Sequence, residues 1–181
     1  HTPITEEITA DLKAGDYVYI TGTLYVARDA AHKRMMEVLD EGKELPFNIQ
    51  DQTIFYVGPT PSKPGQVFGS GGPTTSGRMD AYSPRLIKLG LHAMIGKGYR
   101  SDAVKKAIVD YHGVYFGAIG GAGAMMSSCI EECEVIAFDD LGPEAIRKLK
   151  VKNMPLVVVI DHLGNDLYEI GRKNYLKKDC K

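Results

Sequence analysis

Residues 16–39 read DYVYITGTLYVARDAAHKRMMEVL, and the local pattern changes once along this stretch. Residues 16–21 are rich in β-branched and aromatic side chains and end at Gly22, which predicts a β-strand. Residues 29–39 place alanine, methionine and leucine at helical spacing, with Gly42 beyond them as a stop, which predicts a helix. A strand followed directly by a helix is the repeating unit of α/β proteins.

The same alternation continues along the rest of the chain. Further strands are predicted over residues 53–57, 92–95, 114–116 and 134–138. Further helices are predicted over residues 84–89, from Ser101 onward with that serine as N-cap, and over residues 143–149. Residues 156–160 and 167–170 flank a Gly-Asn turn and predict a terminal hairpin. We therefore expect one α/β domain over residues 1–181, without internal repeats.

Composition excludes several functional classes. The 22 basic and 23 acidic side chains give a net charge of -1, so neither a nucleic-acid stripe nor a membrane-surface patch is expected. The longest apolar runs are strand-sized, and no secretory signal is recognised at the N-terminus. Three cysteines do not describe a disulfide framework, which favours a reducing, cytoplasmic setting.

A first polar cluster, residues 28–34, follows the first strand and opens the first helix. Backbone N–H groups at a helix start attract anions, and an arginine such as Arg28 can grip a carboxylate with two parallel hydrogen bonds. Alternatively, Asp29 caps the helix while Arg28, Lys33 and Arg34 are solvated. On this cluster alone, the second interpretation is the commoner case.

A second cluster, residues 69–80, combines glycines and hydroxyl residues with Arg78. It belongs to a connection over residues 60–77 that lacks periodic structure, and connections of that length are usually functional or disordered. The phosphate-loop pattern is absent, and an arginine beside four hydroxyl residues suits a small carboxylate better than a nucleotide. A flexible surface loop is the alternative, with about an even chance from composition.

A third cluster, Gly96-Lys97-Gly98, holds a lysine at a strand end, although a solvated turn lysine is the commoner case. The glycines of residues 117–123 do not have dinucleotide-binding spacing. Cys129 and Cys133 are four residues apart, Cys180 lies near the end of the chain, and the histidines lack zinc spacing. We therefore expect buried structural thiols and no metal bound by this chain.

Four sequence blocks occur here in an order that resembles a known family. They are TGTLYVARDAAH at residues 21–32, YVGPT at 56–60, GPTTSGRMD at 72–80 and IGKG at 95–98. They resemble the C-terminal region of class I fumarases, which is a separate beta subunit in two-subunit members and in L-tartrate dehydratase. The resemblance runs from about residue 12 to residue 175, and the GPTTSGRMD block is the most specific. It implies a swivelling β/β/α domain, a compact sheet flanked by helices.

The resemblance also implies a partner and a reaction. In the family, an alpha subunit carries three cysteines that hold a [4Fe–4S] cluster with one open iron position, and the assembly is a heterotetramer. The chain is then expected to bind no cofactor itself and to be inactive alone. The implied activity is a hydro-lyase reaction, the reversible hydration of fumarate to L-malate in the tricarboxylic acid cycle.

Matching the blocks residue by residue implies roles for individual side chains. Arg28 and Arg78 would bind the carboxylates of the substrate, and Lys97 would add a cationic contact. Thr74 falls at the position assigned to proton abstraction, with Thr75 beside it in substrate binding, although a neutral threonine is a poor base without assistance. The residues expected to orient the arginines are Asp29, His32 and Asp80.

Other functions stay open on the sequence. Fumarase and L-tartrate dehydratase share these blocks, and fumarase is favoured only because it belongs to central metabolism. A non-catalytic module that binds a small anion in the same cleft is a second possibility. A nucleotide-binding protein is a third, disfavoured by the missing Lys-Ser/Thr signature.

The resemblance yields one direct prediction. Arg78→Ala is expected to abolish turnover in the assembled enzyme and to leave subunit assembly intact, because the lost guanidinium binds substrate. A hydration assay and size-exclusion chromatography on the variant complex check this. Activity near that of the wild type would show that Arg78 does not bind the substrate.

Overall fold

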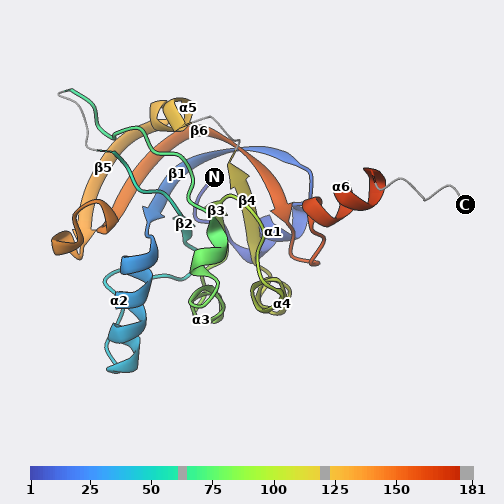
Figure 1. Cartoon of the computed structure of the whole chain (residues 1–181), viewed down its shortest axis with the longest axis horizontal. Helices are drawn as coiled ribbons and strands as arrows, with labels where there is room; N and C mark the ends of the chain where they lie inside the picture. Colours follow the sequence, from blue (N-terminus) through green and yellow to red (C-terminus); the bar gives the residue numbers. More distant parts are fainter. Residues whose placement is uncertain (61–64, 119–122, 176–181) are drawn as a thin grey trace, which may run out of the picture.

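A computed structural model describes residues 1–60, 65–118 and 123–175 of the chain (Figure 1). Most of the glycine run at residues 117–123 and Cys180 therefore lie outside the described residues. No helix in the described ranges is long and apolar enough to cross a membrane.

One sheet organises the described residues. Its strands are β1 (Tyr17–Val26), β2 (Thr53–Phe55), β3 (Ala93–Gly96), β4 (Val114–Ala118), β5 (Ile130–Ala137) and β6 (Ile146–Ile160). Their order is β1-β2-β3-β4-β6-β5, and β1 also pairs with β6. Neighbours from β1 to β4 run parallel, whereas β6 runs antiparallel to β1, β4 and β5. The β1–β6 pairing closes five strands into a ring to which β5 is added.

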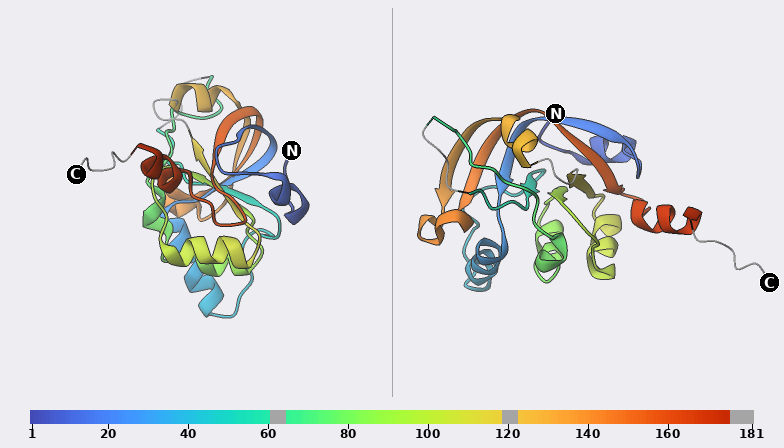
Figure 2. Two further views of the ribbon diagram at one scale, coloured as in Figure 1. Left: turned by 90° about the vertical axis from the view of Figure 1, so that its right-hand side faces the viewer. Right: turned by 45° about the horizontal axis from the view of Figure 1, so that its top comes forward.

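Helices lie mainly along one side of this sheet. They are α1 (Glu6–Asp11), α2 (Asp29–Asp40), α3 (Ser83–Lys88), α4 (Asp102–Asp110), α5 (Gly123–Ser128) and α6 (Leu167–Tyr175), with 3-10 turns η1 (Ser76–Met79) and η2 (Asp139–Glu144). Figure 1 shows α2, α3 and α4 side by side below the strands, while β1, β5 and β6 arch over the opposite side. A second view confirms this layering (Figure 2).

Side-chain alternation along the strands builds two buried clusters. Phe55, Ile95 and Phe116 point into the space that the closed sheet encloses. Their chain neighbours point the other way, as Met94 and Tyr115 do, and pack under the helices. Because successive side chains of a strand face opposite sides, the central parallel strands are apolar on both faces. The α/β class, with a sheet flanked by helices, is confirmed.

Several predicted elements are confirmed with small shifts in their bounds. The helix predicted over residues 29–39 is α2, and the helix predicted from Ser101 is α4. The hydroxyl of Ser101 accepts a hydrogen bond from the amide of Val104, as expected of an N-cap. The first strand, however, does not end at Gly22 but continues to Val26. The pairing with β6 shifts register at Gly22. The φ of this residue is 128°, a backbone angle that glycine adopts readily and other residues rarely do.

Two predictions near the C-terminus are wrong. Residues 143–149 are not a helix, because η2 ends at Glu144 and Ile146 already begins β6. That segment alternates buried and exposed side chains and pairs with a strand on each edge, so tertiary pairing overrides the helical signal. Residues 167–170 belong to helix α6 rather than to a hairpin, and residues 156–160 are the end of β6.

The loop that carries the second polar cluster lies between the ends of β2 and β3. The amide of Thr74 donates to the carbonyl of Tyr56 (2.6 Å), and the amide of Ser76 donates to the carbonyl of Lys97 (2.9 Å). Gly96 makes this insertion possible, because a Cβ there would lie 1.9 Å from the Ser76 hydroxyl oxygen. The segment is therefore held by backbone hydrogen bonds on both sides.

Because Ser76 packs so closely on Gly96, adding one methyl group at this position should destabilise the fold. Gly96→Ala is expected to lower the free energy of unfolding by about 1–3 kcal/mol, because the new Cβ displaces Ser76 from its hydrogen bonds. Denaturant unfolding monitored by circular dichroism measures the change. Gly72→Ala is the matched control, since a Cβ on Gly72 meets nothing within 4 Å. Equal stability of the two variants would contradict the tight packing at Gly96.

Candidate functional site

The predicted site residues follow parallel strands whose carboxyl ends lie at one edge of the sheet. Arg28 comes two residues after β1, the segment of Thr74 lies beyond β2, and Lys97 directly follows β3. In α/β proteins, ligands bind outside the carboxyl ends of such strands. The fold therefore brings the three polar clusters of the sequence to the same edge.

Asp29 links the two arginines that were predicted to bind carboxylates. Its Oδ1 lies 2.9 Å from Nε of Arg78, and its Oδ2 lies 3.8 Å from Nε of Arg28. The Arg78 side chain is 54% exposed and that of Arg28 is 22% exposed, so Arg78 is the more accessible cation. Arg28 packs against Gly58, where a Cβ would lie 1.9 Å from Nη1. Asp29 thus lies beside both arginines.

The sequence suggested that the start of α2 offers a free anion-binding position. In the structure this position is already occupied. The amide of Ala30 donates to Oε2 of Glu144 (2.8 Å), and Oε1 of Glu144 lies 3.5 Å from Nη2 of Arg28. The chain therefore supplies its own carboxylate there, from η2. The alternative in which Asp29 caps the helix is also wrong. Arg28 occupies the N-cap position, and its side chain makes no capping hydrogen bond. Sequence reasoning missed Glu144, since nothing local connects it with residue 28.

Thr74, Thr75 and Lys97 are held next to one another by their backbones. Thr75 and Lys97 form a parallel β-bridge, and both side chains are exposed, while Thr74 is half-buried. In the ranges that the structure describes, the ammonium of Lys97 has no ion-pair partner. An unpaired lysine beside hydroxyl groups is suited to an anionic ligand.

A buried hydroxyl, Ser76, supports this segment from below. Its Oγ accepts hydrogen bonds from the amide of Lys97 (3.1 Å) and from the hydroxyl of Tyr115 (2.8 Å). The Tyr115 hydroxyl also lies 3.1 Å from the carbonyl oxygen of Gly98. Burial raises the pKa of Tyr115, so its phenol stays protonated and remains a donor. Ser76 and Tyr115 therefore tie the Thr74 segment to the Gly96-Lys97-Gly98 turn.

Arg100 is a buried cation that the sequence analysis did not single out. Its Nε donates to Oδ1 of Asp80 (2.7 Å) and its Nη2 donates to Ser83 (2.8 Å). The guanidinium also lies over the rings of Tyr115 (4.9 Å) and Tyr56 (5.4 Å). Burial alone would lower the pKa of Arg100, but Tyr56 and Asp80 outweigh burial and raise it. The side chain therefore stays charged behind the site.

Asp80 consequently has a different role from the predicted one. It was expected to orient Arg28 or Arg78, but its two oxygens accept from Arg100 and from the amide of Ser101 (2.6 Å). It connects the end of η1 with the start of α4. A buried arginine that needs a carboxylate is the physical reason for this pairing.

His32 also acts on the backbone rather than on a guanidinium. Its Nδ1 lies 2.8 Å from the carbonyl oxygen of Arg28, which can only accept, so Nδ1 carries the proton. The ring is fully buried and forms a T-shaped pair with the ring of Tyr56. Burial lowers the pKa of His32 to about 4, against the opposing effect of the bond to Arg28. The neutral ring thus helps to place Arg28 through its main chain.

The described cysteines do not form a metal centre. Cys129 and Cys133 are free thiols, half-buried rather than buried, and burial raises the pKa of Cys129. Within residues 1–60, 65–118 and 123–175, no three histidine, cysteine or acidic side chains gather as metal ligands. Cys180 lies outside those ranges.

Comparisons with known proteins identify the family of this chain. The family model described as "Fumarase C-terminus" matches residues 1–171. The chain is 42% identical over 152 residues to the anaerobic class I fumarate hydratase of Escherichia coli, and equally to fumarate hydratase 1, mitochondrial, of Leishmania major. Each match covers 83% of this chain but 28% of the relative, so the chain spans little more than a quarter of these relatives.

A third relative matches over nearly its whole length. It is a protein of Methanocaldococcus jannaschii assigned as an L(+)-tartrate dehydratase subunit beta, 38% identical over 181 residues. The match covers 96% of this chain and 93% of the relative. Together with the family match, these similarities show that the chain belongs to the fumarase C-terminus family of hydro-lyases.

Proposed function

We propose that this chain is the beta half of an iron–sulfur-dependent hydro-lyase that hydrates fumarate reversibly to L-malate. The observation that carries the proposal is the meeting of Arg28, Asp29 and Arg78 at the sheet edge that also presents Lys97. A dicarboxylate needs cations at both ends, and planar guanidinium groups match carboxylates well. The fumarate hydratases among the relatives support the choice of substrate.

In this proposal, the chain binds the substrate and stabilises charge. Arg78 and Lys97 are the more exposed cations, and Arg28 is held deeper, against Gly58. When the proton next to a carboxylate is removed, negative charge develops on that carboxylate. Cations already fixed around it stabilise the transition state more than the ground state.

Thr74 is the proposed proton-transfer residue. Its amide bond to Tyr56 fixes its backbone, and its side chain is half-buried at the same edge as Lys97. A neutral threonine hydroxyl is a weak base, so a nearby cation that favours the alkoxide is required. Lys97 pairs through the backbone with Thr75, next to Thr74, and would give this assistance.

A partner is proposed to carry the [4Fe–4S] cluster. The described residues offer no three-thiolate set, which fits a cluster held outside this chain. When bound, the cluster would supply a Lewis acid for the substrate hydroxyl and one carboxylate. The partner is either an alpha subunit in a heterotetramer or the remainder of a longer single chain. In both arrangements, the chain alone is inactive.

L-tartrate is the alternative substrate. It is favoured by the similarity to the M. jannaschii protein, which this chain matches over 93% of that protein's length. Tartrate differs from malate by one hydroxyl group. Residues of the partner can provide the contact that discriminates between them.

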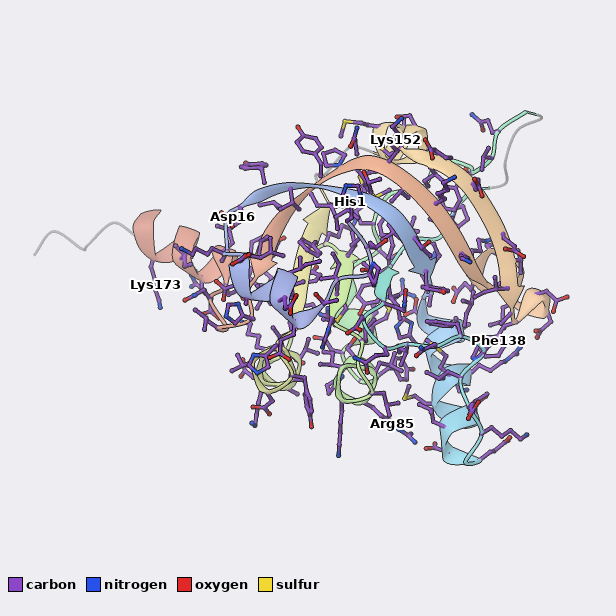
Figure 3. All side chains as sticks on the ribbon, turned by 180° about the vertical axis from the view of Figure 1, so that it is seen from behind. His1, Asp16, Arg85, Phe138, Lys152 and Lys173 are labelled. Carbon is purple, nitrogen blue, oxygen red and sulfur yellow. The ribbon has the colours of Figure 1, made fainter. Side chains whose placement is uncertain are left out.

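The first test is an anaerobic pull-down from native extract with this chain as bait. We expect hydration of fumarate only in the eluate, together with a larger iron-containing chain, and no activity from the bait alone. L-tartrate is assayed in parallel. Arg85→Ala bait is the control, because Arg85 pairs with Asp40 on the helix side, away from the sheet edge (Figure 3). A bait that binds dicarboxylate by calorimetry yet yields no hydration in any eluate would instead establish a binding module.

A second test concerns the proton-transfer residue. Thr74→Val keeps the shape of the side chain and removes its hydroxyl, so kcat of the assembled enzyme is expected to fall by about 10²–10⁴-fold. Thr75→Val, which alters a proposed binding residue, is expected to raise KM instead. Steady-state kinetics on both variants measure these effects. An unchanged kcat for Thr74→Val would assign proton transfer to another group.

A further inference from the structure

Glu144 contacts the start of α2 from a distant part of the chain. It ends η2, which connects β5 with β6, and 114 residues separate it from Ala30. Figure 3 shows this connection, marked by Phe138, beside the upper end of α2, where the helix begins. One carboxylate oxygen accepts from the Ala30 amide at 2.8 Å, and the other lies 3.5 Å from Nη2 of Arg28.

Both carboxylate-binding arginines belong to one row of alternating charges. The row runs Glu144, Arg28, Asp29, Arg78, with nitrogen–oxygen distances of 3.5, 3.8 and 2.9 Å. The Nε of Arg28 is buried and makes no hydrogen bond with any described residue. Two carboxylates therefore hold the Arg28 guanidinium by charge, Glu144 at Nη2 and Asp29 at Nε, rather than by a hydrogen bond to Nε.

This arrangement makes the two arginines depend on Glu144. Without it, Asp29 would be the one carboxylate of this row left to face Arg28, and it already binds Arg78. The two guanidinium groups would then compete for a single carboxylate. Arg28 would turn toward Asp29, and the bond from Asp29 to Arg78 would weaken.

Glu144 also fixes the backbone that carries Arg28 and Asp29. A negative charge at the first turn of a helix satisfies a free amide and interacts favourably with the helix dipole. The cap comes from η2 because Arg28 at the N-cap position provides none. One side chain thus positions both the helix start and the guanidinium beside it.

We propose that Glu144 is a positioning residue for the arginines that bind the substrate carboxylates. This inference rests on the proposed function in taking Arg28 and Arg78 as substrate-binding groups. Glu144 itself does not need to touch the substrate. It acts by holding Nη2 of Arg28 while Asp29 faces Nε.

The same pair of elements provides a matched control. Arg34 of α2 donates twice to Asp140 of η2, at 2.6 and 2.7 Å. This second ion pair also joins α2 to η2 but includes neither proposed carboxylate-binding arginine. Asp140→Asn therefore weakens the contact between α2 and η2 without altering the row of charges at the site.

The experiment compares Glu144→Ala, Glu144→Gln and Asp140→Asn in the assembled enzyme. Glu144→Ala is expected to raise KM for the dicarboxylate about tenfold with kcat changed less, as expected when binding common to ground and transition states is lost. Glu144→Gln keeps an oxygen for the Ala30 amide and should lie between Glu144→Ala and the wild type. Asp140→Asn should keep the wild-type KM. A KM shift as large in Asp140→Asn would overturn the proposal in favour of general docking of η2.

A readout on the purified chain separates this inference from the proposed function. The order parameter of the Arg28 Nε–H group, measured by ¹⁵N relaxation, is expected to fall in Glu144→Ala and to stay at the wild-type value in Asp140→Asn. An ordered Arg28 signal in Glu144→Ala would refute the positioning role, whatever the complex catalyses. If the wild-type complex hydrates no dicarboxylate, the proposed function fails, and this NMR comparison still decides what Glu144 does.

Discussion

The pairing of β6 with β1 is the constraint on which the rest of the structure depends. It extends from Tyr17 opposite Val157 to Val26 opposite Arg147, and it closes the sheet into a ring. Closure removes the free edge of β1 and encloses one apolar cluster inside. It also sets the direction of β1, so that the residues after Val26 reach the same edge as those after β2 and β3.

The site at that edge is supported by buried polar groups. Arg100 is 5% exposed, and a buried charge is costly unless it is paired. Asp80 pairs with it, and Ser83 and two tyrosine rings surround it. The same tyrosines also hold the site: the Tyr115 hydroxyl donates to Ser76, and the Tyr56 carbonyl accepts from the amide of Thr74. The residues that surround the Arg100 guanidinium therefore also fix the Thr74 segment.

Local signals predicted the central part of the fold well. The strand and helix around residues 16–40 and the N-cap at Ser101 depend on neighbours in sequence, and both are present. The prediction failed where pairing overrides local preference. The segment that begins at Ile146 has helix-forming residues, yet it lies between β1 and β5 and becomes a strand. Helix α6 was missed because the apolar residues in 167–170 favoured a hairpin strand.

The sequence by itself determined the α/β class, the family resemblance and the identity of Arg28, Arg78 and Lys97 as candidates, because these depend on residue type and on short motifs. Only the tertiary structure decided their partners. Glu144 rather than a free anion occupies the start of α2, and Asp80 binds Arg100 rather than Arg78. Such contacts join segments brought together by strand register and sheet closure, and no local pattern of side chains encodes which distant carboxylate a given arginine will meet.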